Sequence, residues 1–101
     1  MFQKDKPIRN DKYLSFVRSL GCCITFQHDA VAHHITGLKD SGISTKTSDY
    51  NTIPLCPDLH ALLHQNPKAW EARFGKQEDI LKRVQAMAVR AGALDADYIS
   101  A

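Results

Sequence analysis

Four of the five histidines of this chain lie in one segment, which runs from Ala30 to His64. They form two pairs: His33 and His34 are adjacent, and His60 and His64 are four residues apart. Imidazole is the commonest metal ligand among side chains, and its charge changes near neutral pH without any perturbation. The clustering therefore predicts a metal site, an acid–base site, or both.

The local structure around each pair limits how the rings can act. His60 and His64 lie in a segment that reads as a helix starting at Pro57, so both rings project from one face, where a single cation can reach them. His33 and His34 lie in an apolar run typical of a strand, so they must point to opposite faces. One of them can bind the metal while the other faces the reacting group.

The elements that must position these histidines follow from hydrophobic spacing, capping residues and turn residues. We expect a helix over about 11–20, a β-hairpin of 22–26 and 30–35, a loop over 36–50, a helix from 57, and helices over about 67–74 and 77–91. Residues 1–9 are expected to be a flexible basic arm, and residues 95–101 a frayed tail.

Length and composition indicate one small α+β domain, because the chain has 101 residues and 44% hydrophobic content. No apolar run is long enough to span a membrane, and the N-terminal sequence is unlike a signal peptide. We therefore expect a soluble, cytoplasmic protein without membrane contact. Its three cysteines are an odd number and favour reduced thiols over a disulfide framework.

Two familiar metal chemistries do not fit the spacing. A metalloprotease helix needs glutamate directly after its first histidine, and here that position is Ala61. A two-Cys, two-His zinc finger needs a spaced cysteine pair about a dozen residues before its histidines, whereas Cys22 and Cys23 are adjacent and more distant. Both classes are excluded.

The order His-His, Asn51, His-x-x-x-His resembles the HNH endonucleases, whose ββα-metal unit is a hairpin, a loop and a helix. Asn51 lies nine residues before His60, with an Ile-Pro-Leu-Cys turn between them. Together with the Ala-His-His-Ile strand and the Gly-rich loop, these features look like the small phage and prophage nucleases related to the Ref recombination-enhancement nuclease. The resemblance covers about residues 9–94 and implies an α+β fold with a ββα-metal core over 30–64.

The resemblance also implies roles for the histidines. His34 would be the general base that activates water, and one divalent ion (Mg²⁺, Mn²⁺, Zn²⁺ or Ni²⁺) would be bound by His33, His60 and His64. His33 would thereby belong to the catalytic set. Asn51 would orient the base or fix the loop, with Asp49 as an additional site residue.

The implied activity is metal-dependent hydrolysis of DNA phosphodiester bonds, linked to DNA recombination, with DNA and a recombinase filament as partners. Two alternatives remain open. One is a degenerate HNH-fold protein that binds DNA or a partner protein without cleavage, and the other is a purely structural metal-stabilised module.

The chain departs from the family pattern at its cysteines. Many relatives hold a structural zinc on two cysteine pairs. Here the partners of Cys22 and Cys56 would be Thr25 and Leu59, which cannot bind zinc. We expect this second site to be absent and its place to be filled by packing.

Positive charge is concentrated at the N-terminal end. The first 20 residues carry five basic and two acidic side chains, whereas the chain from Asp58 onward carries six of each. Such an excess suits a polyanion, although a solvated surface without a partner remains the alternative. The expected DNA-binding residues are Lys4, Lys6, Arg9, Lys12, Lys39 and Lys46.

Overall fold

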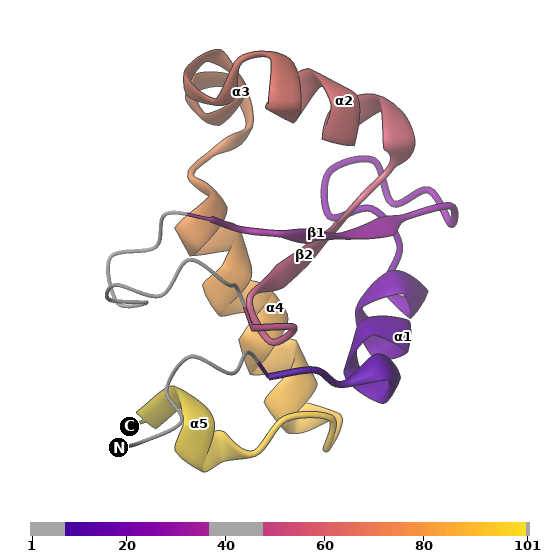
Figure 1. Cartoon of the computed structure of the whole chain (residues 1–101), viewed down its shortest axis with the longest axis vertical. Helices are drawn as coiled ribbons and strands as arrows, with labels where there is room; N and C mark the ends of the chain where they lie inside the picture. Colours follow the sequence, from indigo (N-terminus) through magenta and orange to yellow (C-terminus); the bar gives the residue numbers. More distant parts are fainter. Residues whose placement is uncertain (1–7, 37–47, 101) are drawn as a thin grey trace.

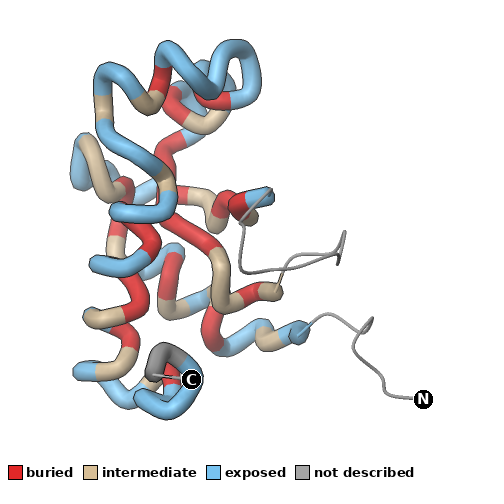
Figure 2. The backbone as a smooth tube through the Cα atoms, turned by 90° about the vertical axis from the view of Figure 1, so that its left-hand side faces the viewer, coloured by how far each residue is buried: buried red, intermediate tan, exposed pale blue. Residues whose placement is uncertain are grey.

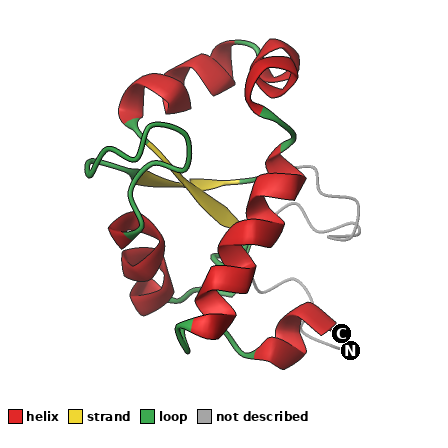
Figure 3. Ribbon diagram, turned by 180° about the vertical axis from the view of Figure 1, so that it is seen from behind, coloured by secondary structure: helices red, strands yellow, loops and turns green. Residues whose placement is uncertain are grey.

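The computed structural model describes residues 8–36 and 48–100. Its elements are α1 (Asp11–Ser19), β1 (Val31–His34), β2 (Thr52–Leu55), α2 (Pro57–Gln65), α3 (Pro67–Phe74), α4 (Gln77–Arg90) and α5 (Ala96–Ser100). The two strands cross the middle of the molecule, with α2 and α3 at one end and α1 and α4 flanking the strands at the other (Figures 1 and 3). This is an α+β fold in which a β-hairpin is followed by helices.

The observed hairpin pairs β1 with β2, whereas the sequence predicted that 30–35 would pair with 22–26. β1 pairs with β2 in antiparallel register, with His33 opposite Ile53. The expectation of a strand over 22–26 is wrong, because the Phe26 N–H donates to the Cys22 C=O at 2.8 Å and closes a turn. Gly21 and Phe26, at φ 78° and 64°, are both in the left-handed region, which a strand cannot contain.

β2 occupies the residues that the sequence indicated as an Ile-Pro-Leu-Cys turn, so that expectation is also wrong. Pro54 has no N–H and usually weakens a strand, but it is tolerated where no ladder hydrogen bond is required of it. Its C=O accepts a hydrogen bond from the Cys23 N–H at 2.9 Å. The turn after α1 therefore covers the outer edge of β2 and ties it to the N-terminal part of the chain.

The helices predicted from local signals are confirmed. The Asn10 side chain accepts from the Tyr13 N–H and caps α1, and the Asn66 side chain accepts from the Ala69 N–H and caps α3. Pro57 occupies the first turn of α2, where its missing N–H costs nothing. None of the helices in the described part of the chain is long and apolar enough to cross a membrane.

The two ends of the chain are more ordered than expected where they are described. Residues 96–100 form α5 instead of a frayed tail, and the Tyr98 ring packs edge-on against Tyr50 with 5.0 Å between centroids. At the other end, the Ile8 C=O accepts from the Asp49 N–H at 3.0 Å, so residues 8 and 9 are not part of a free arm. The rest of the expected arm and most of the expected 36–50 loop lie outside the described residues.

The core lies between the strands, α1 and α4, and Figure 2 shows its buried segments running through the middle of the molecule. Tyr13 and Ile53 are 1% and 0% exposed. Trp70 anchors α3 to α2, since its indole N–H donates to the Leu59 C=O at 3.2 Å. Burial, with smaller effects of Tyr98 and Tyr50, raises the pKa of Tyr13 to about 12.

The Tyr13 hydroxyl is buried and has no hydrogen-bond partner among the described residues. An unsatisfied buried hydroxyl costs about 1–3 kcal/mol. Tyr13→Phe is therefore expected to raise the free energy of unfolding by about 1 kcal/mol, measured by urea denaturation. Tyr50→Phe is the matched control and is expected to lower the free energy of unfolding, because the Tyr50 hydroxyl accepts from Asn10 Nδ2 at 3.2 Å. A loss of stability in Tyr13→Phe would contradict this prediction.

Candidate metal centre

Three of the four clustered histidines converge in space. His33 comes from β1, and His60 and His64 lie on consecutive turns of α2. His33 Nδ1 is 3.1 Å from His60 Nε2, which is 3.1 Å from His64 Nε2, and the three ligand atoms all lie within 4.8 Å of one another. As expected, His60 and His64 project from the same face of α2, and both rings lie beside His33.

Two of the three nitrogen–nitrogen separations match those found around a single transition-metal ion. Metal–imidazole bonds are about 2.0–2.1 Å long, which places neighbouring ligand nitrogens about 2.8–3.4 Å apart in octahedral or tetrahedral geometry. The two 3.1 Å separations fall in this range. A nitrogen-only ligand set suits Zn²⁺ or Ni²⁺ better than Mg²⁺, which prefers oxygen.

Hydrogen bonding orients the first of these ligands. His33 Nε2 lies 2.9 Å from Gln77 Oε1, and an amide oxygen can only accept, so this assignment places the ring proton on Nε2. The lone pair of Nδ1 then points toward His60. One proton on His60 Nε2 can serve only one of its two neighbours, whereas a cation can be bound by several nitrogen lone pairs at once.

The environment of His33 and His60 favours their neutral forms, as metal binding requires. Burial, followed by the neighbouring histidines, lowers the pKa of His33, and the hydrogen bond with Gln77 only partly opposes this effect. Burial and the charge of His64 lower the pKa of His60. Both groups are therefore in the ligand form at neutral pH.

Gln77 was not found from the sequence. It lies 44 residues from His33, at the start of α4, and its backbone N–H is fixed by Glu71 Oε2 at 2.9 Å. Glutamine at a helix start carries no local sign of such a role. Because outer partners of this kind hold a ligand ring in place, Gln77 belongs to the candidate centre as a positioning residue.

Gln77→Ala is expected to weaken zinc binding by about 10–100-fold, because His33 loses the partner that fixes its tautomer. Gln77→Glu keeps an acceptor at the same place and should bind zinc at least as tightly as the unaltered protein. Competition with a chromophoric chelator measures both affinities. Equal affinities in all three proteins would remove Gln77 from the site.

His34 points away from the three ligands, as adjacent strand residues must. Its Nε2 lies 2.8 Å from Asp49 Oδ1, while Asp49 Oδ2 accepts from the Asn10 N–H at 2.7 Å. Although burial raises the pKa of Asp49, the hydrogen bonds from His34 and Asn10 outweigh it and lower that pKa overall. The carboxylate is 2% exposed and charged, so it accepts the His34 Nε2 proton, and in the neutral ring the lone pair lies on Nδ1.

The structure gives Asn51 and Asp49 different surroundings. Asp49 contacts His34 directly, whereas Asn51 has contacts that hold the chain: its C=O accepts from the Ile35 N–H at 3.0 Å. Asn51 Oδ1 accepts from Gln85 Nε2 at 3.4 Å, and Gln85 Nε2 also donates to the Tyr50 C=O at 2.9 Å. Through these contacts Asn51 ties the start of β2 to α4 and to the residue that follows β1.

The expected DNA-binding residues are only partly described. Arg9 Nη1 lies 3.3 Å from Asp49 Oδ1, which places this cation beside the His34 pair. Lys12 is exposed on α1. The remaining positions, Lys4, Lys6, Lys39 and Lys46, lie outside the described residues.

The positions that correspond to a second zinc site in the resembled family pack together. Cys22, Cys56 and Leu59 form one small buried cluster, with Ile24 and Phe74 against it. The Cys22 Sγ accepts from the Thr25 N–H at 3.4 Å. Burial raises the pKa of Cys22, but hydrogen bonds from Thr25 and backbone N–H groups lower it overall to about 7.

The fold and the site together define an α+β protein with a three-histidine candidate metal centre beside a His–Asp pair. By its sequence, the chain belongs to the family "Protein of unknown function (DUF968)", whose model matches residues 2–92. It is similar to "Uncharacterized protein YdfU" of Escherichia coli (strain K12), with 30% identity over 84 residues that cover 83% of this chain and 24% of that protein. The chain thus spans about a quarter of that relative's length. No solved structure matches the chain significantly.

Proposed function

We propose that this protein is a metal-dependent DNA endonuclease of the HNH type. The observation that carries the proposal is the convergence of His33, His60 and His64 at one point, with the His34–Asp49 pair immediately next to it along β1. Phosphodiester hydrolysis needs an activated water and neutralisation of the charge that develops on phosphate. The two groups of side chains supply these two requirements separately.

The order of elements around the site also supports the proposal. β1 carries His33 and His34, β2 pairs with it, and α2 with His60 and His64 begins two residues after β2 ends. The contacts of α2 with both strands hold this unit together. The HNH resemblance implies a β-hairpin and a ligand-bearing helix, and both are present, although the loop lies between the two strands instead of between the hairpin and the helix.

In this proposal, His34 accepts a proton from water at Nδ1. Asp49 holds the ring through Nε2, selects this tautomer and stabilises the imidazolium that forms. His33, His60 and His64 would hold one divalent cation, which when bound supplies Lewis-acid stabilisation of the phosphate. Gln77 keeps His33 aligned, and the Gln85–Asn51 contact fixes the segment that precedes β2.

Supercoiled plasmid incubated with the purified protein tests the proposal. Nicking is expected with Mn²⁺, Ni²⁺, Zn²⁺ or Mg²⁺, and a chelator should stop it. Parallel single-stranded and duplex oligonucleotides define the DNA form that is cut. Binding without any cleavage across these metals and DNA forms would reject an endonuclease and favour a degenerate HNH-fold protein that only binds DNA. A recombinase filament as partner and a phage or prophage origin belong to the same proposal, and adding filament-coated DNA tests the filament.

Contacts with DNA phosphates are proposed for basic residues that precede and follow β1 in the sequence. Replacing Lys39 and Lys46 by glutamine should reduce cleavage more than binding, because they lie between the His34 strand and Asn51 in sequence. Replacing Lys4 and Lys6 should lower the salt slope of binding by about 0.9 for each duplex DNA phosphate that is no longer neutralised. Fluorescence anisotropy over a salt series measures this, with Lys82→Gln as the control. An unchanged slope would make these lysines a solvated surface.

A further inference from the structure

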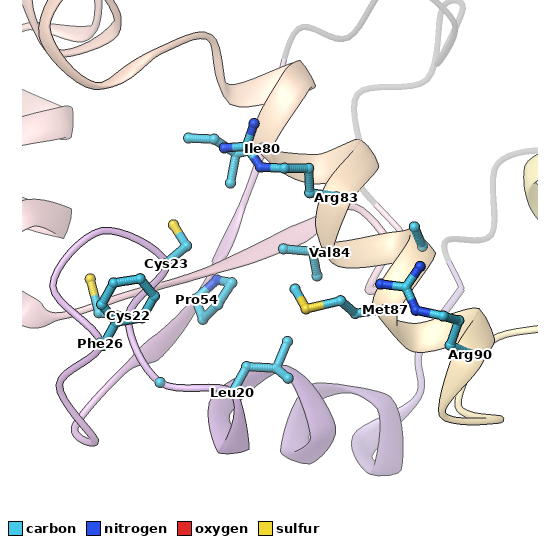
Figure 4. Close-up of a pocket in the computed structure, with 12 residues that line it drawn as sticks. Leu20, Cys22, Cys23, Phe26, Pro54, Ile80, Arg83, Val84, Met87 and Arg90 are labelled. Carbon is cyan, nitrogen blue, oxygen red and sulfur yellow. The ribbon is translucent and has the colours of Figure 1, made fainter.

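A groove that no histidine lines has no role in the proposed chemistry. It lies between α4 on one side and the end of α1 with the turn after it on the other, and it encloses about 540 Å³ (Figure 4). Neither the three ligand histidines nor His34 and Asp49 line it. Its function must therefore be argued from its own residues.

The inner surface of the groove is apolar. Leu20, which follows α1, and Pro54 from β2 line one side of it, and Val84 and Met87 line it from α4. Met87 is 36% exposed, and methionine adapts its shape to different apolar partners. An open apolar surface of this kind is typical of a protein interaction site.

Phe26 stands at the edge of the groove and is the most exposed large hydrophobic side chain among the described residues, at 74%. Its φ of 64° places it in the left-handed region, which is unusual for an aromatic residue. The turn that presents it is held by hydrogen bonds of 2.8 Å between Phe26 and Cys22 and between Cys22 and Gln27. The ring is thus presented to solvent by a defined turn, and burial against a partner would remove its apolar surface from water.

Two arginines are the only charged residues that line the groove in the described part of the chain. Arg83 and Arg90 are exposed, and neither makes a salt bridge with another described residue. They are seven residues apart on α4, so they lie on the same helix face about 10 Å apart, with Met87 between them. One carboxylate opposite each arginine would neutralise both charges.

We propose that this groove binds a short amphipathic segment of a partner protein, with two carboxylates that flank an apolar stretch. Because Arg83 and Arg90 are positively charged, the partner segment should be acidic. Because the lining is apolar, the partner should bury apolar side chains in the groove. Acidic residues two helical turns apart match the spacing of the arginines, and the side chains between them would contact Met87 and Phe26. A DNA interface would instead be expected to be polar and much more basic than this lining.

Random displayed peptides of about 14 residues, long enough for roughly four helical turns, test the proposal without assuming a sequence. Selected against the full chain, they should be enriched in paired acidic residues around apolar ones. The Arg83→Glu/Arg90→Glu double variant should bind those peptides at least about tenfold more weakly, a change of about 1.4 kcal/mol, and should select basic peptides instead. Met87→Glu should also lose the peptides, whereas Lys82→Gln on the same helix should keep them.

Circular dichroism and plasmid nicking accompany each variant. Groove variants are expected to fold and to retain any cleavage, so a failure of the groove proposal is distinguishable from a failure of the nuclease proposal. No enrichment, or enriched peptides without acidic residues, would overturn the inference. Loss of plasmid binding in the double arginine variant would assign the groove to DNA. Dimers that Met87→Glu dissociates would assign it to a second copy of this chain.

Discussion

His60→Ala is expected to abolish metal binding and DNA cleavage together. His60 Nε2 is the central atom of the cluster, 3.1 Å from a nitrogen of both His33 and His64. Losing a ligand should lower zinc affinity by more than about 100-fold, because even the loss of a supporting residue costs about 10–100-fold. The cleavage that depends on the metal should fall by the same factor at limiting zinc.

Thermal stability gives a second readout that does not depend on cleavage. Zinc at about 100 times its Kd should stabilise the unaltered protein by about 2.7 kcal/mol, which raises the Tm of a domain of this size by more than about 10 °C. This rise should disappear in His60→Ala and in His64→Ala. His28→Ala is the matched control, because His28 is exposed and outside the cluster. An equal zinc-dependent rise in His60→Ala would show that the metal binds elsewhere.

The features predicted well from sequence are those set by neighbouring residues. α1 and α3 begin at asparagine caps, α2 begins at a proline, and the spacing of apolar residues gives α4. Likewise, the shared face of His60 and His64 follows from helical geometry, and the opposite orientations of His33 and His34 follow from that of a strand. In each case the determining contacts are within a few residues.

The features predicted poorly depend on distant partners. β-branched and apolar residues over 22–26 suggested a strand, but its backbone is bent by left-handed residues and by contacts with β2. The true partner of β1 is separated from it by the segment 35–51, and neighbouring sequence does not encode that pairing. Gln77 is equally remote, since only folding brings α4 beside β1. Asp49 was noticed as a candidate, but its contact with His34 could not be deduced from spacing.

His34→Gln and Asp49→Asn are expected to reduce cleavage by similar factors, on the order of 10²–10⁴, while zinc affinity changes little. His34 would lose its role as proton acceptor. In Asp49→Asn the amide can donate to Nε2, so the ring proton moves to Nδ1 and the base is blocked in the wrong tautomer. Because both changes disable one unit, the double variant should be no slower than the worse single variant.

Single-turnover cleavage of a labelled duplex, with zinc affinity and Tm measured in parallel, tests this pair. Asp49 also binds Asn10 and Arg9, so Asp49→Asn is interpreted only if its Tm in the absence of metal stays close to that of the unaltered protein. His34→Gln carries no such complication and stands as the decisive variant. Full cleavage by His34→Gln would reject His34 as the base. Multiplying losses in the double variant would show that His34 and Asp49 act separately, with Asp49 holding the fold around Asn10 instead of orienting the ring.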